Sequence, residues 1–333
     1  MTNNTYRSMV VSQTDNGRYQ REITAKRVSE LPEGDVLIRV NYSSLNYKDA
    51  LSAVGNKGVT RNYPHTPGID AAGVVEACSD GSFPLNAQVL VTGYDLGMNT
   101  SGGFGQYIRV PSDWVVPLPS GLSERESMIF GTAGFTAAMS VYRLASAGVT
   151  PDRGDILVTG ATGGVGSLAV AILATAGYKV AAVSGKKQAA AFLKELGATD
   201  ILPREALADS AKKPLLEKRW MGVVDTVGGD ILSTAIKSTH QRGVVTCCGL
   251  VASPKLNLTV FPFILRGVSL FGIDSASCPM AERKTLWYKL ANEWKPLGLE
   301  RIASEINLMR LDENIAKILE GQQIGRKIIN LNS

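Results

Sequence analysis

The stretch VTGATGGVGSLAV, at residues 158–170, places glycines between a short and a longer apolar run. The first run predicts a buried strand, and the second predicts a helix. Glycines at such a crossover allow a tight turn, close approach of the backbone to a pyrophosphate, and close packing of helix on strand. The helix N-terminus directs unpaired N–H groups at the phosphates. The glycines Gly160, Gly163, Gly164 and Gly166 therefore predict a dinucleotide-binding loop.

Strand-like and helix-like segments alternate around this loop. Apolar strands are predicted at 155–160, 179–185, 222–228, 243–250 and 268–274, and helices at 123–148, 166–177 and 187–197. Continuous apolar strands that alternate with helices are typical of a parallel sheet covered on both faces. We therefore predict an α/β fold with a doubly wound parallel sheet over residues 125–274.

The rest of the chain has a different pattern. Short strands separated by Gly and Pro are predicted at 34–46, 67–78 and 86–95, and they indicate a compact β-rich unit over residues 1–124. Residues 275–333 mix a helix-like stretch, 282–294, with short strands. The residues alone leave open whether this last segment completes the first unit or stands apart.

The strand after the glycines bears on the choice of dinucleotide. A cofactor with a free 2′-hydroxyl usually meets an Asp or Glu about 20 residues beyond the glycines. Here that strand ends in Ser184, Gly185, Lys186 and Lys187, without an acid. A hydroxyl and an ammonium would bind a 2′-phosphate that a carboxylate would repel, and Arg204 could add a guanidinium. The pattern favours NADPH over NADH; the alternative is that these charges are simply solvated.

Composition excludes several classes of protein. The 333 residues carry a net charge of +5 with scattered basic residues, whereas nucleic-acid binding usually needs a concentrated basic stripe. No run of about 18 apolar residues predicts a membrane span, and the N-terminus does not resemble a secretory signal. The 4 cysteines form no C-x-x-C pair, which favours reduced thiols and a cytoplasmic location.

A catalytic zinc site is not expected. Such a site needs three protein ligands, typically Cys and His. The chain has 2 histidines, His65 and His240, which lie far apart, and the first unit has one cysteine, Cys78. We interpret His65 as a loop residue and His240 as a surface residue near the end of a helix. Alcohol oxidation, which usually wants a Lewis acid, is disfavoured for the same reason.

Blocks along nearly the whole chain carry a resemblance to a known family. They are SSLNYKDAL (43–51), PGIDAAGVV (67–75), GTAGFTAAM (131–139), VTGATGGVGS (158–167), VSGK (183–186), LGA and ILPR (196–204), DTVGG (225–229), CCGLV (247–251), PFILRGVSLFGIDS (262–275) and GRKI (325–328). The chain resembles the medium-chain dehydrogenase/reductase superfamily and, within it, the acryloyl-CoA reductase group, also labelled quinone oxidoreductases. SSLNYKDAL and PFILRGVSLFGIDS are specific to this group, whereas the glycine motif is shared far more widely.

The resemblance implies a domain organisation. A GroES-like catalytic domain is formed by residues 1–124 and 275–333, and a Rossmann NADPH-binding domain, residues 125–274, is inserted between them. Where zinc-containing relatives carry His-Glu, this chain has Ile69-Asp70, which agrees with the absence of a predicted metal site.

The resemblance also implies the cofactor contacts. Tyr47 and Thr132 would flank the nicotinamide, and Arg326 would close over the cofactor. The phosphate loop would be Thr162, Gly163, Gly164 and Val165; the 2′-phosphate would meet Ser184, Gly185, Lys186 and Arg204; and Leu250, Ile264 and Ser275 would line the cleft.

The implied activity is conjugate reduction, in which hydride from NADPH attacks the β-carbon of an acryloyl thioester or a similar enone. The protein must orient the cofactor and stabilise the developing enolate. Asn46, Tyr47 and Lys48 are the candidate hydrogen-bond donors, and Tyr47 is also the candidate proton relay. Asp70 would orient Lys48 or Tyr47, or else cap a turn.

Alternatives remain at this stage. A quinone or enone oxidoreductase without preference for coenzyme A would have the same motifs, and so would a non-catalytic NADPH-binding sensor or structural protein. A small-molecule substrate is expected, with no nucleic acid and no membrane as partners. The apolar strand VSLFGI, at 268–273, predicts a homodimer, because an exposed sheet edge can pair with its copy.

Overall fold

The glycine-rich stretch folds as a strand, a turn and a helix in a computed structural model that describes residues 5–209 and 213–333. Strand β8 (Ile156–Val158) is fully buried and precedes the turn, and helix α3 (Gly164–Thr175) follows it. Eight of the helix's residues, Gly166 to Leu173, are buried, so α3 is an interior helix with no polar face. The turn between β8 and α3 is therefore anchored on both sides by buried elements.

The chain divides into two compact units, of which the second contains this turn. The first unit comprises the chain up to Thr132 with Ala276–Ala291 and Gly298–Ser333, and the second comprises Ala133–Ser275 and Asn292–Leu297. Nearly all of the C-terminal segment thus folds with the N-terminal part. The division falls after Thr132, inside a helix, whereas the sequence placed it after residue 124.

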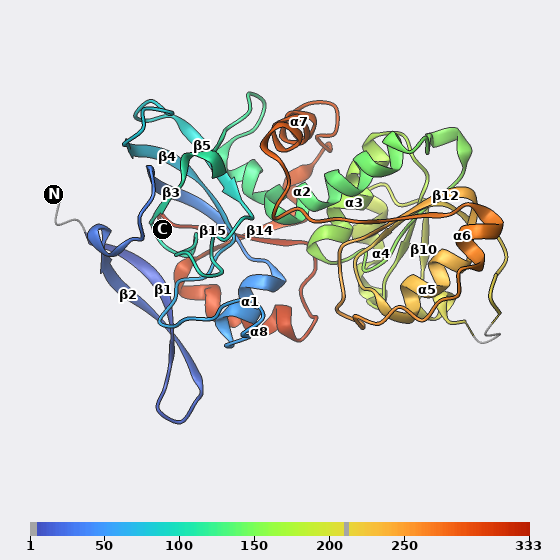
Figure 1. Cartoon of the computed structure of the whole chain (residues 1–333), viewed down its shortest axis with the longest axis horizontal. Coiled ribbons are helices and arrows are strands. Elements are labelled where there is room, and N and C mark those ends of the chain that lie inside the picture. Colours follow the sequence, from blue (N-terminus) through green and yellow to red (C-terminus); the bar gives the residue numbers. More distant parts are fainter. Residues whose placement is uncertain (1–4, 210–212) are drawn as a thin grey trace. The chain divides into compact units, whose positions relative to one another are not determined.

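Six parallel strands form the sheet of the second unit. Their order is β10-β9-β8-β11-β12-β13, so the chain runs outward from β8 in one direction and then in the other. Helices flank the strands on both sides (Figure 1). This confirms the predicted doubly wound α/β fold, in which ligands bind at the carboxyl ends of the strands where the order reverses, here β8 and β11. The remaining elements are β9 (Val180–Val183), β10 (Asp200–Leu202), β11 (Trp220–Asp225), β12 (Thr239–Cys247), β13 (Ser269–Gly272), α4 (Ala190–Glu195), α5 (Gly229–Lys237) and α6 (Phe261–Arg266).

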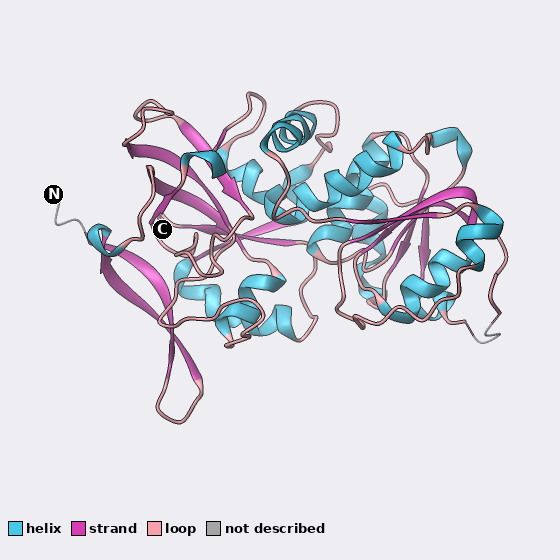
Figure 2. Cartoon of the chain, viewed as in Figure 1, coloured by secondary structure: helices cyan, strands magenta, loops and turns pink. Residues whose placement is uncertain are grey.

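The first unit is built on a seven-stranded, mostly antiparallel sheet. Its order is β14-β15-β3-β4-β5-β7, with β6 also paired to β3, and β1 and β2 form a separate hairpin (Figure 2). Strands β3 and β15 meet through Ser44 and Ile328, so the C-terminal strand lies beside the predicted catalytic loop. The elements are β1 (Thr5–Gln13), β2 (Tyr19–Arg27), β3 (Val36–Ser44), β4 (Asp70–Cys78), β5 (Gln88–Thr92), β6 (Tyr107–Val110), β7 (Val116–Pro117), β14 (Ala303–Asn307), β15 (Arg326–Asn330), α1 (Tyr47–Ala53), α7 (Met280–Ala291) and α8 (Leu311–Leu319).

Helix α2 (Glu124–Ser146) differs from the single continuous helix that the sequence predicted. The backbone leaves the helical region at Gly131, where φ is 50° and ψ is −156°, so two helical segments meet at a break. The reason lies in a buried polar cluster of the first unit, described below. Within the described residues, no helix has the length and apolarity needed to cross a membrane.

Candidate active site

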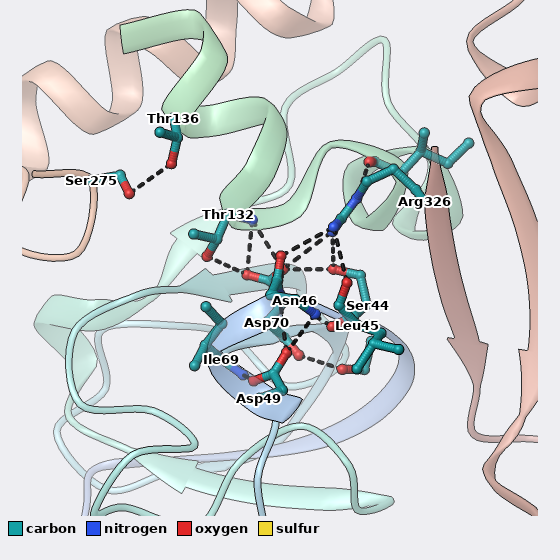
Figure 3. Close-up of polar contacts among 12 residues, drawn as sticks. Ser44, Leu45, Asn46, Asp49, Ile69, Asp70, Thr132, Thr136, Ser275 and Arg326 are labelled. Atoms are coloured by element: carbon teal, nitrogen blue, oxygen red, sulfur yellow. Dashed lines mark hydrogen bonds and ion pairs between the residues drawn. The ribbon is translucent and has the colours of Figure 1, made fainter. Parts of the chain in front are cut away.

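A turn at Asn46 joins β3 to α1 and forms one side of a buried polar cluster in the first unit (Figure 3). The Asp49 carboxylate accepts from the Asn46 backbone N–H at 2.8 Å, an arrangement that satisfies an orphan donor at the start of α1. Its other oxygen accepts from the Ile69 backbone N–H, also at 2.8 Å. Asp49 therefore joins the Asn46 turn to the residue that precedes β4.

Asp70, the first residue of β4, is fully buried and forms the centre of the cluster. Its Oδ2 accepts from Ser44 Oγ at 2.6 Å and from Asn46 Nδ2 at 2.7 Å. Its Oδ1 accepts from Thr132 Oγ1 at 2.6 Å, and the Thr132 backbone N–H lies 2.9 Å and 3.0 Å from the two oxygens. One carboxylate thus holds together β3, α1 and α2.

Arg326, the first residue of β15, supplies the positive charge of the cluster. Its guanidinium nitrogens donate to Ile129 O at 3.1 Å, Leu45 O at 3.0 Å, Asn46 Oδ1 at 3.1 Å and Ser44 Oγ at 2.7 Å, and Nη2 lies 3.7 Å from Asp70 Oδ2. The residue is 2% exposed. The resemblance implied that Arg326 closes over the cofactor, but here its guanidinium is enclosed by the first unit, because every nitrogen already has a protein partner.

The break in α2 is explained by this cluster. A Cβ at Gly131 would lie 2.4 Å from Asp70 Oδ2 and 2.5 Å from Ser44 Oγ, and the residue has positive φ. Any side chain would therefore push against the carboxylate, and the left-handed backbone suits glycine alone. The break also turns the Thr132 N–H toward Asp70.

The cluster contains two carboxyl groups, Asp49 and Asp70, and one guanidinium. Burial, and then the negative charge of Asp70, raise the pKa of Asp49 to about 7. Burial lowers the pKa of Arg326, while both carboxylates oppose that shift. Arginine stays charged in proteins, so one of the two acids is left without a full counter-charge. A proton on Asp49 would bring the cluster to neutrality.

Two of the predicted catalytic side chains, those of Tyr47 and Lys48, take no part in the hydrogen bonds of the cluster described above. Tyr47 is 39% exposed and is the first residue of α1. Lys48 Nζ lies 3.9 Å from Met98 Sδ. Asp70 contacts neither of them, so our expectation that it orients Lys48 or Tyr47 directly is corrected: it holds Asn46, the residue before them, together with Ser44 and Thr132.

The predicted phosphate loop lies in the second unit. Gly160 has a φ of 58°, and a Cβ there would lie 2.4 Å from Thr226 Oγ1; a Cβ at Gly166 would lie 2.3 Å from Gly160 O. Both glycines are therefore needed for the turn and for the packing of α3. Gly163 is the N-cap of α3 and has no side chain with which to cap it, which suits an anion as the partner of the first amides. Thr162 is buried, and Gly163, Gly164 and Val165 are half-buried around the turn.

The structure brings together the residues predicted for the 2′-phosphate. Ser184 follows β9; its Oγ accepts from the Lys186 backbone N–H at 3.0 Å and lies 3.4 Å from Thr162 Oγ1. A Cβ on Gly185 would be 3.1 Å from Arg204 Nη2, so the guanidinium lies against this glycine. Burial, and then the charge of Arg204, lower the pKa of Lys186. Two neighbouring cations of this kind favour a bound anion.

The remaining predicted contacts are also placed by the structure. Leu250 and Ile264 are 63% and 68% exposed. Ser275 Oγ accepts from Thr136 Oγ1 at 2.7 Å (Figure 3). These residues and the phosphate loop belong to the second unit, whereas Tyr47, Thr132 and Arg326 belong to the first.

The polar cluster does not fit a zinc site, because its side chains are carboxylates, an amide, hydroxyls and a guanidinium, without cysteine or histidine. Across residues 5–209 and 213–333, no three His, Cys, Asp or Glu side chains are grouped as metal ligands. His65 is buried, and its Nε2 lies 2.9 Å from Gly97 O; burial lowers its pKa. His240 is the second residue of β12 and half-buried, rather than a surface residue at a helix end.

Besides Asp49, sequence reasoning missed three residues that organise these sites. Ser44 and Gly131 complete the polar cluster, and only a glycine inside a predicted helix gave a signal for the second of them. Asp225, fully buried at the end of β11, accepts from Thr159 Oγ1 at 2.7 Å and from the Gly228 backbone N–H at 2.8 Å. An acid that ends the apolar strand GVVD was a signal for this third residue.

Comparisons with known proteins agree with this architecture. The family model for the alcohol dehydrogenase GroES-like domain matches residues 32–120, and the model for zinc-binding dehydrogenase matches residues 164–292. The quinone oxidoreductase YhfP of Bacillus subtilis is 44% identical over 91% of this chain and 92% of its own. The acrylyl-CoA reductase AcuI of Ruegeria pomeroyi is 42% identical over 98% of this chain and 100% of its own.

Solved structures show the same similarity. The yhdH oxidoreductase of Salmonella enterica, crystallised with NADP, has a TM-score of 0.94 and 42% identity, covering 97% of this chain and 99% of that one. Bacillus subtilis yhfP, crystallised with NAD, has a TM-score of 0.96 and 40% identity, covering 98% and 99%. The fold and the two polar sites therefore define a medium-chain dehydrogenase/reductase architecture. Within that superfamily, the chain belongs to the group that contains acrylyl-CoA reductase AcuI and quinone oxidoreductase YhfP.

Loss of the guanidinium should destabilise the first unit in a pH-dependent way. Arg326→Met leaves two buried carboxyls without a counter-charge, which we expect to cost about 3–5 kcal/mol at pH 8. The loss should shrink as the pH falls toward 5, because the orphaned carboxyls, whose folded pKa values then lie above the unfolded ones, take up protons. Urea unfolding of both proteins between pH 5 and pH 8 measures this difference in the free energy of unfolding.

The matched control is Arg125→Met, which removes an arginine of the same unit from its partly exposed ion pairs with Glu300 and Glu305. Its cost should stay within about 1 kcal/mol. Equal, pH-independent losses in the two variants would contradict the role assigned to Arg326.

Proposed function

We propose that this chain is an NADPH-dependent reductase that transfers hydride to an activated carbon–carbon double bond, with acryloyl-CoA or a related enoyl thioester as the substrate. The observation that carries the proposal is the pair of cations, Lys186 and Arg204, beside an uncapped glycine loop, in a chain that is 42% identical over 98% of its length to an acrylyl-CoA reductase. A close structural relative was crystallised with NADPH.

The residues of the second unit fit such a cofactor. The N-terminus of α3 suits the pyrophosphate, and the group formed by Ser184, Lys186 and Arg204 suits a dianionic 2′-phosphate. We assign cofactor binding to Tyr47, Thr132, Thr162, Gly163, Gly164, Val165, Ser184, Gly185, Lys186, Arg204, Leu250, Ile264 and Ser275. Arg326, whose guanidinium is occupied inside the first unit, is assigned a positioning role instead.

Bound NADPH supplies the hydride, and the side chains of the first unit would handle the resulting charge. Reduction at the β-carbon places negative charge on the thioester oxygen, which hydrogen-bond donors stabilise. Tyr47 and Lys48 have polar groups outside the buried cluster, and we assign them this role, with Tyr47 as the proton relay to the α-carbon. Asn46 directs its amide hydrogens at Asp70, Asp49 and Ser44, so it holds the turn rather than the substrate.

A quinone or enone oxidoreductase is the second candidate, because YhfP, a quinone oxidoreductase, is 44% identical to this chain. Both candidates would act without zinc, and the cluster offers neither cysteine nor histidine. A cytoplasmic location is part of the proposal and is supported by the four free thiols of Cys78, Cys247, Cys248 and Cys278.

Substrate preference distinguishes the candidates. With NADPH at saturation, we expect kcat/KM to be highest for acryloyl-CoA, lower for crotonyl-CoA and lowest for 1,4-benzoquinone, because the extra methyl of crotonyl-CoA hinders attack on its β-carbon. NADPH absorbance at equal enzyme concentration measures all three. A preference for the quinone would establish the second candidate, and oxidation of NADPH by none of them would indicate a non-catalytic sensor or structural protein.

Cofactor preference tests the assignment of the cations. Lys186→Ala and Arg204→Ala should each lower kcat/KM for NADPH by about 10- to 100-fold, since a hydrogen bond to a charged group contributes about 1.5–3 kcal/mol. Activity with NADH should change little, and Ser184→Asp should shift preference further toward NADH. The control is Lys187→Ala, at an exposed neighbouring lysine. Equal losses with both cofactors would refute the assignment.

A homodimer is also part of the proposal, and it is supported by an apolar surface on the second unit. Eight of the 14 exposed large hydrophobic residues of the described chain lie between residues 250 and 271; besides Leu250 and Ile264, which are assigned to the cofactor, they are Val251, Leu256, Val260, Phe261, Leu265 and Phe271. Strand β13 is the edge strand of the sheet in this region. Exposed apolar side chains on segments next to an open strand edge are typical of a self-association surface.

Charge placed on this surface should separate the subunits. Leu265→Glu combined with Phe271→Glu should convert the dimer to a monomer in sedimentation velocity, because each carboxylate would be buried in the interface. Leu85→Glu, at a residue 64% exposed in the first unit, is the control and should leave the dimer intact. A wild-type chain that sediments as a monomer at micromolar concentration would overturn the proposal.

A further inference from the structure

We propose that Asp49 is a positioning residue, whose ionised carboxylate fixes the Asn46 turn and thereby sets the place of Tyr47 in catalysis. The proposal rests on the function proposed above and adds a residue to it. The case begins with what surrounds Asp49, which is fully buried in the first turn of α1.

Among the described residues, the hydrogen-bond partners of the Asp49 carboxylate are three donors. They are the Asn46 backbone N–H at 2.8 Å, the Asn46 amide nitrogen at 3.2 Å and the Ile69 backbone N–H at 2.8 Å. An ionised carboxylate accepts all three hydrogen bonds, whereas a protonated one presents an O–H to a group of N–H donors. A proton on Oδ2, which accepts both hydrogen bonds from Asn46, therefore displaces a bond that holds the turn, and a proton on Oδ1 weakens the bond to Ile69 that holds the carboxylate in place.

Tyr47 depends on this turn because it is the next residue. Asn46 is held on its other sides by Asp70, which accepts from Nδ2 at 2.7 Å, and by Arg326, which donates to Oδ1 at 3.1 Å. Asp49 alone in the cluster contacts the Asn46 backbone, so it fixes the direction in which the main chain enters α1. The side chain of Tyr47 is 39% exposed, and among the described residues no hydrogen bond holds its hydroxyl group.

The charged groups around Asp49 make its ionisation respond to pH. Asp70 faces it from β4 and Arg326 from β15, and Lys48, its neighbour on α1, turns toward Met98. Burial and Asp70 raise the pKa of Asp49 to about 7. The ionised, turn-holding form therefore predominates at pH 8 and falls to about one tenth of the population at pH 6.

Protonation of Asp49 should affect stability and activity in opposite directions, and that difference identifies a positioning role. The folded pKa of about 7 lies above the unfolded value of about 4, so the folded chain binds this proton more tightly. Acidification through pH 7 therefore increases the stability contributed by Asp49 while it removes the form that positions Tyr47. A merely structural role would make activity and stability fall together.

The experiment measures kcat for acryloyl-CoA, the Kd for NADPH and the Tm at half-unit steps between pH 6 and 9. For the wild type we expect kcat to fall about tenfold from pH 8 to pH 6. Protonation of Asp49 should not lower the Tm over the same range. At pH 8, Asp49→Asn should have the kcat that the wild type has at pH 6, and its kcat should not vary with pH near pH 7. Its Kd for NADPH should change less than its kcat, because Tyr47 is only one of the assigned cofactor contacts. Asp312→Asn, at an exposed acid in the first turn of α8, should keep the wild-type profile.

A second readout needs no turnover. With ring-¹³C tyrosine, the Tyr47 resonance, assigned as the one absent from Tyr47→Phe, should titrate with a midpoint near pH 7 in the wild type. It should not do so in Asp49→Asn if that variant folds. A pH profile or a Tyr47 titration that persists in Asp49→Asn, or a wild-type Tyr47 signal that does not change between pH 6 and 8, would overturn the proposal. A wild type that titrates at Tyr47 but reduces no substrate would instead refute the proposed function.

Discussion

The first unit depends on a buried ion pair and its hydrogen bonds, in which the Asp70 carboxylate lies 3.7 Å from the Arg326 guanidinium. A charge without water around it must be matched by charge and by donors, and here both are supplied by segments far apart in the sequence. Asn46 and Ser44 come from the loop after β3, Thr132 from the break in α2, and Arg326 from the C-terminal strand. The C-terminal segment is thus a required part of this unit rather than an appendage.

The backbone of α2 lies so close to the Asp70 carboxylate that only glycine fits at the point of contact. Gly131 must lack a side chain because Asp70 and Ser44 occupy its space, and the resulting break directs Thr132 to the carboxylate. In the second unit, Gly160 and Gly166 must also lack a side chain. The space that a Cβ would need is occupied by Thr226 at Gly160 and by the backbone carbonyl of Gly160 at Gly166. In both units, a glycine inside or beside a helix marks a place where polar groups crowd against the main chain.

The doubly wound sheet, its glycine loop and the group of Ser184, Lys186 and Arg204 could be predicted from sequence, because each depends on local patterns: apolar strands, glycine spacing and the absence of an acid after β9. The polar cluster could be predicted only in part. Asn46 and Asp70 stood in recognisable motifs, but nothing local indicates that Arg326 meets them across 256 residues of chain or more. The role of Asp49 was hidden for another reason: an acid early in a helix has an ordinary explanation as a cap, and only its burial beside a second acid shows more.

The uncapped start of α3 has a practical consequence. On the assignment proposed above, its first amides, and the cations Lys186 and Arg204 after the neighbouring strand, would bind phosphate groups without regard to the molecule that bears them. Inorganic phosphate or sulfate in an assay buffer would then compete with the dinucleotide. Apparent cofactor affinities for this protein are therefore meaningful only when the anions in the buffer are stated.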